Sequence, residues 1–152
     1  MRPNALRALW QSGGAAVNGW LAIANSFSAE TMAHQGWDSL TIDLQHGVID
    51  YGQMVPMLQA ISTTNTVPVV RVPWNDAVMV KRVLDAGATT VLFPFVQTAD
   101  EAARAVAATR YPPQGVRGMA GMSRASKFGT VPNYLKTANA GMGVIVQLET
   151  PQ

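Results

Sequence analysis

The sequence predicts an α/β fold, a (β/α)8 TIM barrel of which about six strands are present. Segments with strand character alternate with segments of helical period at spacings of roughly 20 to 25 residues, which is typical of repeated βαβ units and a parallel sheet. The strand segments are nearly continuous apolar runs, as burial on both faces of a sheet requires. An eight-stranded barrel has about 250 residues. We therefore interpret residues 1–152 as a single, partial barrel domain that stops after its sixth strand.

The strands are predicted from runs of apolar and β-branched residues. The first run, WLAIA, is interpreted as a buried strand. Its Trp20, like Trp74 later in the chain, is expected in the core, and the lining of a pocket is the alternative for both. The run near the end of the chain, VIVQL, has the composition of an interior strand. The predicted strands are residues 20–24, 39–45, 67–72, 89–96, a minimal strand around Val116, and 144–148.

Helices are predicted between the strands from apolar residues that recur at helical spacing. Ser28 is the expected N-cap of the helix that follows the first strand. Pro56 lies inside the next helix, near its start or at a kink. The methionines at positions 54, 57 and 79 are expected in the core. The predicted helices are a short one near the N-terminus, then residues 28–34, 51–62, 75–86, 100–109 and 131–138.

The composition excludes several classes of protein. Charged residues make up only 13% of the chain and apolar residues 48%, which indicates that part of the surface is covered by other subunits or by further chain. The net charge is +2 and Lys and Arg form no run, so a nucleic-acid-binding face is not expected. The absence of cysteine excludes disulfides and thiolate metal sites. No segment resembles a signal peptide or a membrane span, and a cytoplasmic location is expected.

Polar side chains follow several of the predicted strands. The carboxyl ends of parallel strands meet at one edge of a sheet, where βα folds collect their functional groups. In a barrel we expect these side chains to converge on one mouth. They are Asp43, Gln45 and His46 after the second strand, Arg71 in the third, and Gln147 and Glu149 in the last.

These residue types suit an anionic substrate. A carboxylate and an amide hold a hard divalent cation through oxygen. A guanidinium binds a carboxylate or stabilises an enolate oxygen, and an imidazole moves a proton near neutral pH. An arginine within a β-branched strand is costly to bury without a partner, which favours a functional role for Arg71.

Each of these residues also has a purely structural interpretation. His46 is equally explained as an exposed loop residue. Asp43 either orients His46 or caps a neighbouring loop. Glu149 is explained as an acid at a helix start, although Gln147, two residues earlier, shares its face of the strand and favours a common site. His34, in a helical context, is expected at the surface.

Five segments carry a recognisable pattern, and in chain order they are GWDSLTIDLQHGVIDY, VPVVRVPWND, VLFPFVQTADEAARAV, RYPPQGVRG and VIVQLET. Together they resemble the HpcH/HpaI aldolases, a family of class II, metal-dependent pyruvate aldolases. The resemblance extends from about Ala5 to Thr150. Each segment alone is unspecific, but five in the same order are specific to the superfamily.

The resemblance implies a role for each residue at the predicted mouth. His46 corresponds to the catalytic base, with Asp43 in the same motif, and Arg71 to the arginine that stabilises the enolate. Glu149 corresponds to one metal carboxylate and Gln147 to a neighbouring substrate contact. The implied fold is a TIM barrel of the phosphoenolpyruvate/pyruvate type that assembles as a homohexamer, and the implied process is the catabolism of aromatic compounds.

Asp85 corresponds in the resemblance to an acid that raises the basicity of the histidine, with contact across a subunit boundary as one arrangement. Its alternative interpretation, a surface residue of a helix, stays open. Lysines that could form an imine with a keto acid stand in predicted helices or loops rather than in strands, which disfavours that class of aldolase. They are Lys81, Lys127 and Lys136.

The resemblance further implies a divalent metal, Mg²⁺, Mn²⁺ or Co²⁺, and a keto acid substrate. The implied reaction is the reversible cleavage of a 4-hydroxy-2-oxo acid to pyruvate and an aldehyde. The family's second metal carboxylate lies on a later strand that this sequence does not contain. Because Glu149 and one amide alone make a poor Mg²⁺ site, metal binding by these residues is expected to be weak or absent.

Three other functions stay open. An acyl-CoA lyase of the same superfamily, acting on a malyl or citryl thioester, needs basic residues for the CoA phosphates, and these are sparse near the predicted mouth. A non-catalytic, truncated fragment would have exposed apolar edges and no turnover. A phosphate-binding barrel enzyme would need a Gly-rich loop in a later part of the chain.

Overall fold

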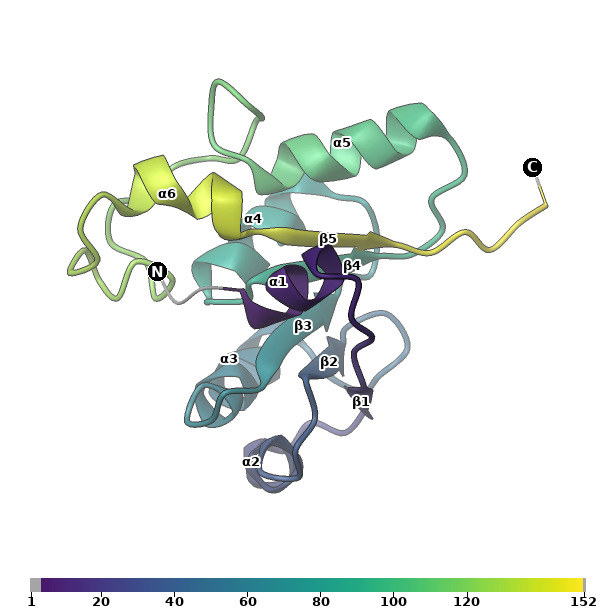
Figure 1. The fold of residues 1–152 in the computed structure, drawn as a ribbon, viewed down its shortest axis with the longest axis vertical. Coiled ribbons are helices and arrows are strands. Elements are labelled where there is room, and N and C mark those ends of the chain that lie inside the picture. Colours follow the sequence, from purple (N-terminus) through teal and green to yellow (C-terminus); the bar gives the residue numbers. More distant parts are fainter. Residues whose placement is uncertain (1–3, 152) are drawn as a thin grey trace.

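A parallel five-stranded sheet organises the chain in the computed structural model, which describes residues 4–151 (Figure 1). The strands lie side by side in chain order, and every neighbouring pair is parallel. This order is that of successive βαβ units, as the sequence predicts. The strands are β1 (Asn18–Leu21), β2 (Ser39–Asp43), β3 (Val67–Arg71), β4 (Thr90–Phe93) and β5 (Gly143–Val146).

Helices connect the strands, and several begin with a side-chain cap. Asp50 and Thr98 start their helices with complete capping boxes, which satisfy the free N–H groups of the first turn. Pro56 lies inside its helix, as predicted. The helices are α1 (Ala5–Gln11), α2 (Ser26–Ala33), α3 (Tyr51–Ile61), α4 (Ala77–Asp85), α5 (Ala99–Thr109) and α6 (Tyr134–Gly141).

The predicted N-cap of α2 is wrong by three residues. The side-chain oxygen of Asn25 accepts a hydrogen bond of 2.8 Å from the backbone N–H of Ser28, so Ser28 lies in the first turn and Asn25 caps it. Asn and Ser are about equally good N-caps. The local sequence therefore does not distinguish Asn25 from Ser28 as the N-cap. The helix that begins after Asn25 buries Ala29 and Ala33 in the core, and this packing favours the earlier start.

The predicted strand around Val116 is wrong, and the described part of the chain has five strands instead of about six. The backbone N–H of Val116 donates to the carbonyl of Ala107 at 2.9 Å, and that of Arg117 to the carbonyl of Arg110. Both bonds fold the segment back onto the end of α5. Its backbone groups are therefore satisfied without a sheet partner.

Each face of the sheet carries its own hydrophobic core. The larger core packs α2 to α5 against strand residues that include Ile42, Val70 and Val91. On the opposite face α1 crosses the strands, and its Leu6 packs with Val69 and neighbouring apolar side chains (Figure 1). Because successive side chains of a strand point to opposite faces, the residues that alternate with the larger core share a face with α1.

The two predicted core tryptophans are not in the core. Trp20 is 44% exposed and Trp74 is 58% exposed. Trp20 alternates along β1 with buried Gly19 and Leu21, so it points to the face that is only partly covered. The methionines expected in the core are confirmed, since Met54 and Met57 are buried and position 79 packs against them. No helix within residues 4–151 has the length and hydropathy needed to cross a membrane.

Candidate active site

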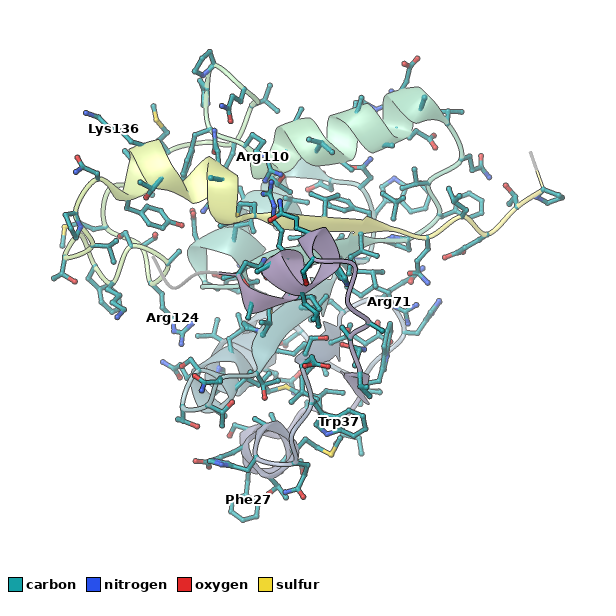
Figure 2. All side chains as sticks on the ribbon, viewed as in Figure 1. Phe27, Trp37, Arg71, Arg110, Arg124 and Lys136 are labelled. Carbon is teal, nitrogen blue, oxygen red and sulfur yellow. The ribbon has the colours of Figure 1, made fainter. Side chains whose placement is uncertain are left out.

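The register of the sheet brings polar side chains from different strands to one face. Asp43 is paired with Arg71, Arg71 with Leu92, and Leu92 with Ile145. Gln147 follows Ile145 by two residues and continues along the same face. Figure 2 shows Arg71 near the carboxyl ends of the strands, away from α6 and the loop before it. This is the end of a parallel sheet at which functional groups usually gather.

Asp43 and Arg71 form a bidentate ion pair at the centre of this face. The Arg71 Nε donates to Oδ1 of Asp43 at 2.9 Å, and its Nη2 donates to Oδ2 at 2.6 Å. The Asp43 side chain is only 4% exposed and that of Arg71 12%. Such a fork fixes the plane of the guanidinium.

The charge on Asp43 is strongly stabilised. Burial alone would raise its pKa, but hydrogen bonds from Arg71, from the backbone of His46, from Trp20 and from the backbone of Gln45 outweigh burial. Together they hold the pKa of Asp43 well below its usual range. The Asp43 carboxylate is therefore ionised at neutral pH.

Trp20 completes the support of Arg71. Its indole Nε1 donates to Oδ2 of Asp43 at 3.2 Å, and its ring lies under the guanidinium, with Cζ of Arg71 4.8 Å from the ring centroid. This cation–π contact and the ion pair hold the same cation from two sides. The sequence alone favours the core for Trp20, whereas the structure turns it to the face opposite buried Gly19 and Leu21.

His46 stands in the loop after β2, and its side chain is exposed. Its backbone N–H, like that of Gln45, donates to Oδ1 of Asp43, at 3.1 Å and 3.0 Å respectively. Of the two interpretations of Asp43, the structure thus shows the loop cap, and its carboxylate orients the backbone of His46 rather than the imidazole. Within residues 4–151 the imidazole has no hydrogen-bond partner, which leaves it available to a ligand.

Gly47 lets this loop pack closely against the loop after β1. A Cβ at position 47 would lie 2.4 Å from the carbonyl oxygen of Asp43 and 3.2 Å from Cα of Ala22. The next residue, Val48, donates its N–H to the carbonyl of Ala22 at 3.1 Å. The break at Gly47 therefore fixes where His46 leaves the strand.

Gln147 and Glu149 reach the site from the segment after β5. The Nη1 of Arg71 lies 3.5 Å from Oε1 of Gln147, and the backbone of Gln147 is held by Val96, whose N–H donates to its carbonyl at 3.0 Å. Glu149 is exposed and accepts a hydrogen bond of 3.4 Å at Oε1 from the backbone N–H of Phe95. Nη1 is thus the guanidinium nitrogen of Arg71 that makes no hydrogen bond to Asp43.

The metal-binding capacity of these residues is partial. Within residues 4–151 no group of three or more His, Cys, Asp or Glu side chains is placed to hold a metal ion. Glu149 nevertheless keeps free lone pairs and is open to solvent, and Oε1 of Gln147 is a second hard oxygen. Since Mg²⁺ is often held by one or two carboxylates with water and substrate oxygens in the other positions, these two residues fit part of such a site.

Asp85 lies away from the other predicted site residues. It is the last residue of α4, which returns the chain to the amino end of the sheet, whereas His46 follows the carboxyl end of β2. Its carboxylate accepts a hydrogen bond of 2.7 Å from Nη2 of Arg117, a buried arginine whose guanidinium stacks over Tyr111. The structure does not bring Asp85 to His46 within one chain, so a role at this site would need a neighbouring subunit.

The sequence and the fold of this chain are similar to those of known proteins. The model of the HpcH/HpaI aldolase/citrate lyase family matches residues 17–152. A curated relative from Salmonella heidelberg (strain SL476), 4-hydroxy-2-oxo-heptane-1,7-dioate aldolase, is 48% identical over 148 residues. These cover 97% of this chain but 56% of the relative, so the chain spans about half the length of the curated relatives it matches.

Solved structures share the fold. An HpcH/HpaI aldolase/citrate lyase family protein from Burkholderia cenocepacia J2315 superposes with a TM-score of 0.93 at 43% identity, over 97% of this chain and 60% of that one. Macrophomate synthase superposes with a TM-score of 0.79 at 26% identity, over 97% of this chain and 52% of its own. With the family model matching most of the sequence, the chain belongs to the HpcH/HpaI aldolase/citrate lyase family.

Proposed function

We propose that the protein is a divalent-metal-dependent aldolase that reversibly cleaves a 4-hydroxy-2-oxo acid to pyruvate and an aldehyde. The observation that carries this proposal is the Arg71 guanidinium, which Asp43 and Trp20 hold rigidly with one edge left towards Gln147. A cation that is fixed before substrate binds stabilises developing negative charge without reorganisation. The names of the curated relatives support the same reaction class.

Arg71 has the role of stabilising the negative charge that forms on the keto oxygen. Two of its donors are committed to Asp43, which keeps the guanidinium from turning. The 3.5 Å between Nη1 and Oε1 of Gln147 is long for a hydrogen bond, so a ligand oxygen can approach Nη1 more closely and form a stronger one. We assign this N–H to the enolate oxygen and the Gln147 amide to the substrate beside it.

His46 has the role of the base. Its exposed imidazole removes the proton from the C4 hydroxyl, directly or through one water. The electron pair of that O–H bond forms the aldehyde carbonyl, the C3–C4 bond breaks, and its pair moves onto the keto acid to give the pyruvate enolate. Protonation at C3 then yields pyruvate. Glu149, with Gln147, would hold a divalent cation, which supplies Lewis-acid polarisation of the keto acid when it is bound.

The wider expectations belong to this proposal as well. We infer that the five-stranded sheet is a section of a (β/α)8 barrel of the phosphoenolpyruvate/pyruvate type, supported by its parallel, sequential strands. We also infer a homo-oligomer, as the resemblance implies a hexamer, supported by large exposed apolar side chains at the surface. They include Ile23, Phe27, Val48 and Met122. A cytoplasmic location and a role in aromatic catabolism remain predictions of the resemblance.

The proposal is tested with the complete gene product. Pyruvate release from a 4-hydroxy-2-oxo acid is measured in an assay coupled to lactate dehydrogenase. We expect turnover with Mn²⁺ and loss of turnover with a chelator, restored by added metal. His46→Ala should lose cleavage while calorimetry still shows Mn²⁺ binding, because the imidazole is not assigned to the metal.

Two results would contradict this assignment. Turnover that is insensitive to the chelator would exclude the metal-dependent class. Loss of Mn²⁺ binding in His46→Ala would make His46 a ligand rather than the base. Cleavage of a malyl or citryl thioester in place of the hydroxy-oxo acid would instead favour the acyl-CoA lyase alternative.

A further inference from the structure

The segment after β4 lies between two parts of the candidate site. Because β4 stands between β3 and β5 in the sheet, the residues that follow it are neighbours of both Arg71 and Glu149. The backbone N–H of Phe95 donates to Oε1 of Glu149 at 3.4 Å, and that of Val96 donates to the carbonyl of Gln147. Sequence reasoning treated this segment only as an apolar strand end.

Phe95 has an unusual backbone conformation for a bulky residue. Its φ angle is 53°, in the left-handed region that disfavours side chains with a Cβ. Its neighbours Pro94 and Val96 are buried, whereas Phe95 is 39% exposed. The conformation turns the N–H of Phe95 to Glu149 and leaves its ring at the surface, and such departures concentrate at functional sites.

Trp74 packs against this ring from the adjacent loop. It follows Arg71 by three residues, and its ring centroid lies 5.8 Å from that of Phe95 with the planes inclined by 31°. The two rings, with Asn75 and Arg104 among the other lining residues, bound a cavity of about 80 Å³. That is about two to three times the volume one water occupies in the liquid, which is room for a short carbon chain.

The charges around this cavity offset one another. The guanidinium of Arg104 lies 3.8 Å from the carboxylate of Glu101. The other carboxylate oxygen of Glu101 accepts hydrogen bonds from the backbone of Gln97 and Thr98 at the start of α5. The cavity therefore has little net charge with which to select an ion. Asn75, Glu101 and Arg104 give it a polar side, and the rings of Trp74 and Phe95 form its apolar wall.

We propose that Trp74 and Phe95 form the wall that selects the aldehyde, and that they accept a short apolar carbon chain attached to the aldehyde carbonyl. This inference rests on the proposed aldolase function and specifies the second substrate of that site. Apolar carbons beyond the carbonyl gain contact with the two rings, and acetaldehyde, which has only a methyl group, gains least. Butanal is therefore the preferred partner of pyruvate over acetaldehyde.

The test is the ratio of kcat/KM for butanal to that for acetaldehyde in aldol addition to pyruvate. Any change in the pyruvate step cancels in this ratio. One methylene in an apolar pocket is worth about tenfold or more in kcat/KM. We expect the ratio to fall at least about tenfold in Trp74→Ala and in Phe95→Ala, and Trp74→Phe to keep most of the preference because it retains a ring.

Phe27→Ala is the matched control. Phe27 is another exposed phenylalanine, 76% accessible, but it lies on α2 well away from Arg71 (Figure 2). Its removal should leave the ratio unchanged. A ratio that stays the same in both Trp74→Ala and Phe95→Ala, or that falls equally in Phe27→Ala, overturns the proposed wall.

Deuterium exchange at the pyruvate methyl group, measured by NMR without aldehyde, separates the two proposals. Wild-type exchange together with an unchanged ratio overturns the aldehyde wall and leaves the aldolase function standing. Absence of wild-type exchange overturns the aldolase function and the wall with it. Exchange together with the expected fall in the ratio supports both.

Discussion

At the scale of single residues, Asp43 links the loop that carries His46 to the guanidinium of Arg71, the cation that we propose faces the substrate. It accepts two hydrogen bonds from Arg71, one from Trp20, and one each from the backbones of Gln45 and His46. A nearly buried carboxylate with this many donors contributes to stability only while it is ionised. One side chain therefore supports both the fold and the proposed chemistry.

The depressed pKa of Asp43 gives stability a specific pH dependence. In the unfolded chain an aspartate has a pKa of about 3.9, and in the folded protein the pKa of Asp43 is lower. The folded state thus binds fewer protons, so the stabilisation is fully present above about pH 4 and is lost as the pH falls towards the folded pKa. In Asp43→Asn this contribution is absent at every pH.

We therefore expect Asp43→Asn to lower the free energy of unfolding by about 3 kcal/mol at pH 7, because it leaves Arg71 without its charged partner. Urea unfolding at pH 7 and at pH 3 measures the effect. The variant should lose less stability than the wild type between these two pH values. Equal losses in both proteins would show that the ion pair does not contribute this pH dependence.

At the scale of secondary structure, much of the fold is readable from the sequence. The alternation of β-branched runs with helical periods predicts β2, β3, β4 and β5 to within a few residues, and α3 to α5 likewise. The segment around Val116 has strand-like residues, but the carbonyls at the end of α5 satisfy its backbone. That competition is tertiary, and a local pattern does not contain it.

The same limit applies to the candidate site. Polar residues after the strands identify Asp43, Arg71 and Gln147, which the structure brings into contact. The contact of Trp20 with Asp43 and Arg71 is not readable from the sequence. The face to which Trp20 points depends on the register of the short edge strand β1 with β2. Asp85 has an acidic side chain in a helix, and only the fold reveals that buried Arg117 binds it at the other end of the sheet.

The cap of α2 is a prediction that belongs to this scale. Asn25→Ala should lower the free energy of unfolding by about 1 kcal/mol, because it removes the acceptor of the Ser28 N–H. Ser28→Ala is the matched control and should have almost no effect, since its exposed hydroxyl makes no cap. Chemical denaturation of both variants measures this difference. A larger loss in Ser28→Ala would return the helix start to the residue that the sequence first indicated.

At the scale of the whole molecule, the amino ends and the carboxyl ends of the strands carry different kinds of contacts. The amino ends carry α1 and the Asp85–Arg117 pair, both of which hold the structure together. The carboxyl ends carry exposed His46 and Glu149 and the braced guanidinium. A division into a stabilising end and an end that carries the candidate site is typical of parallel βα architectures.

The central claim is that side chains from three successive βα units and the last strand share one site, with Arg71 as its fixed cation. Lysine keeps the charge but not the fork, so Arg71→Lys tests geometry rather than charge alone. Arg82→Lys is its matched control, since Arg82 is an exposed helix arginine that stacks on Tyr51.

The most direct measurement is deuterium exchange at the pyruvate methyl group, followed by NMR with Mn²⁺ replaced by diamagnetic Mg²⁺. We expect exchange in the wild type and in Arg82→Lys, and a loss of at least about a hundredfold in Arg71→Lys, the size of effect seen when a preorganised donor to an oxyanion is removed. Exchange in Arg71→Lys within a few-fold of the wild type would contradict the account.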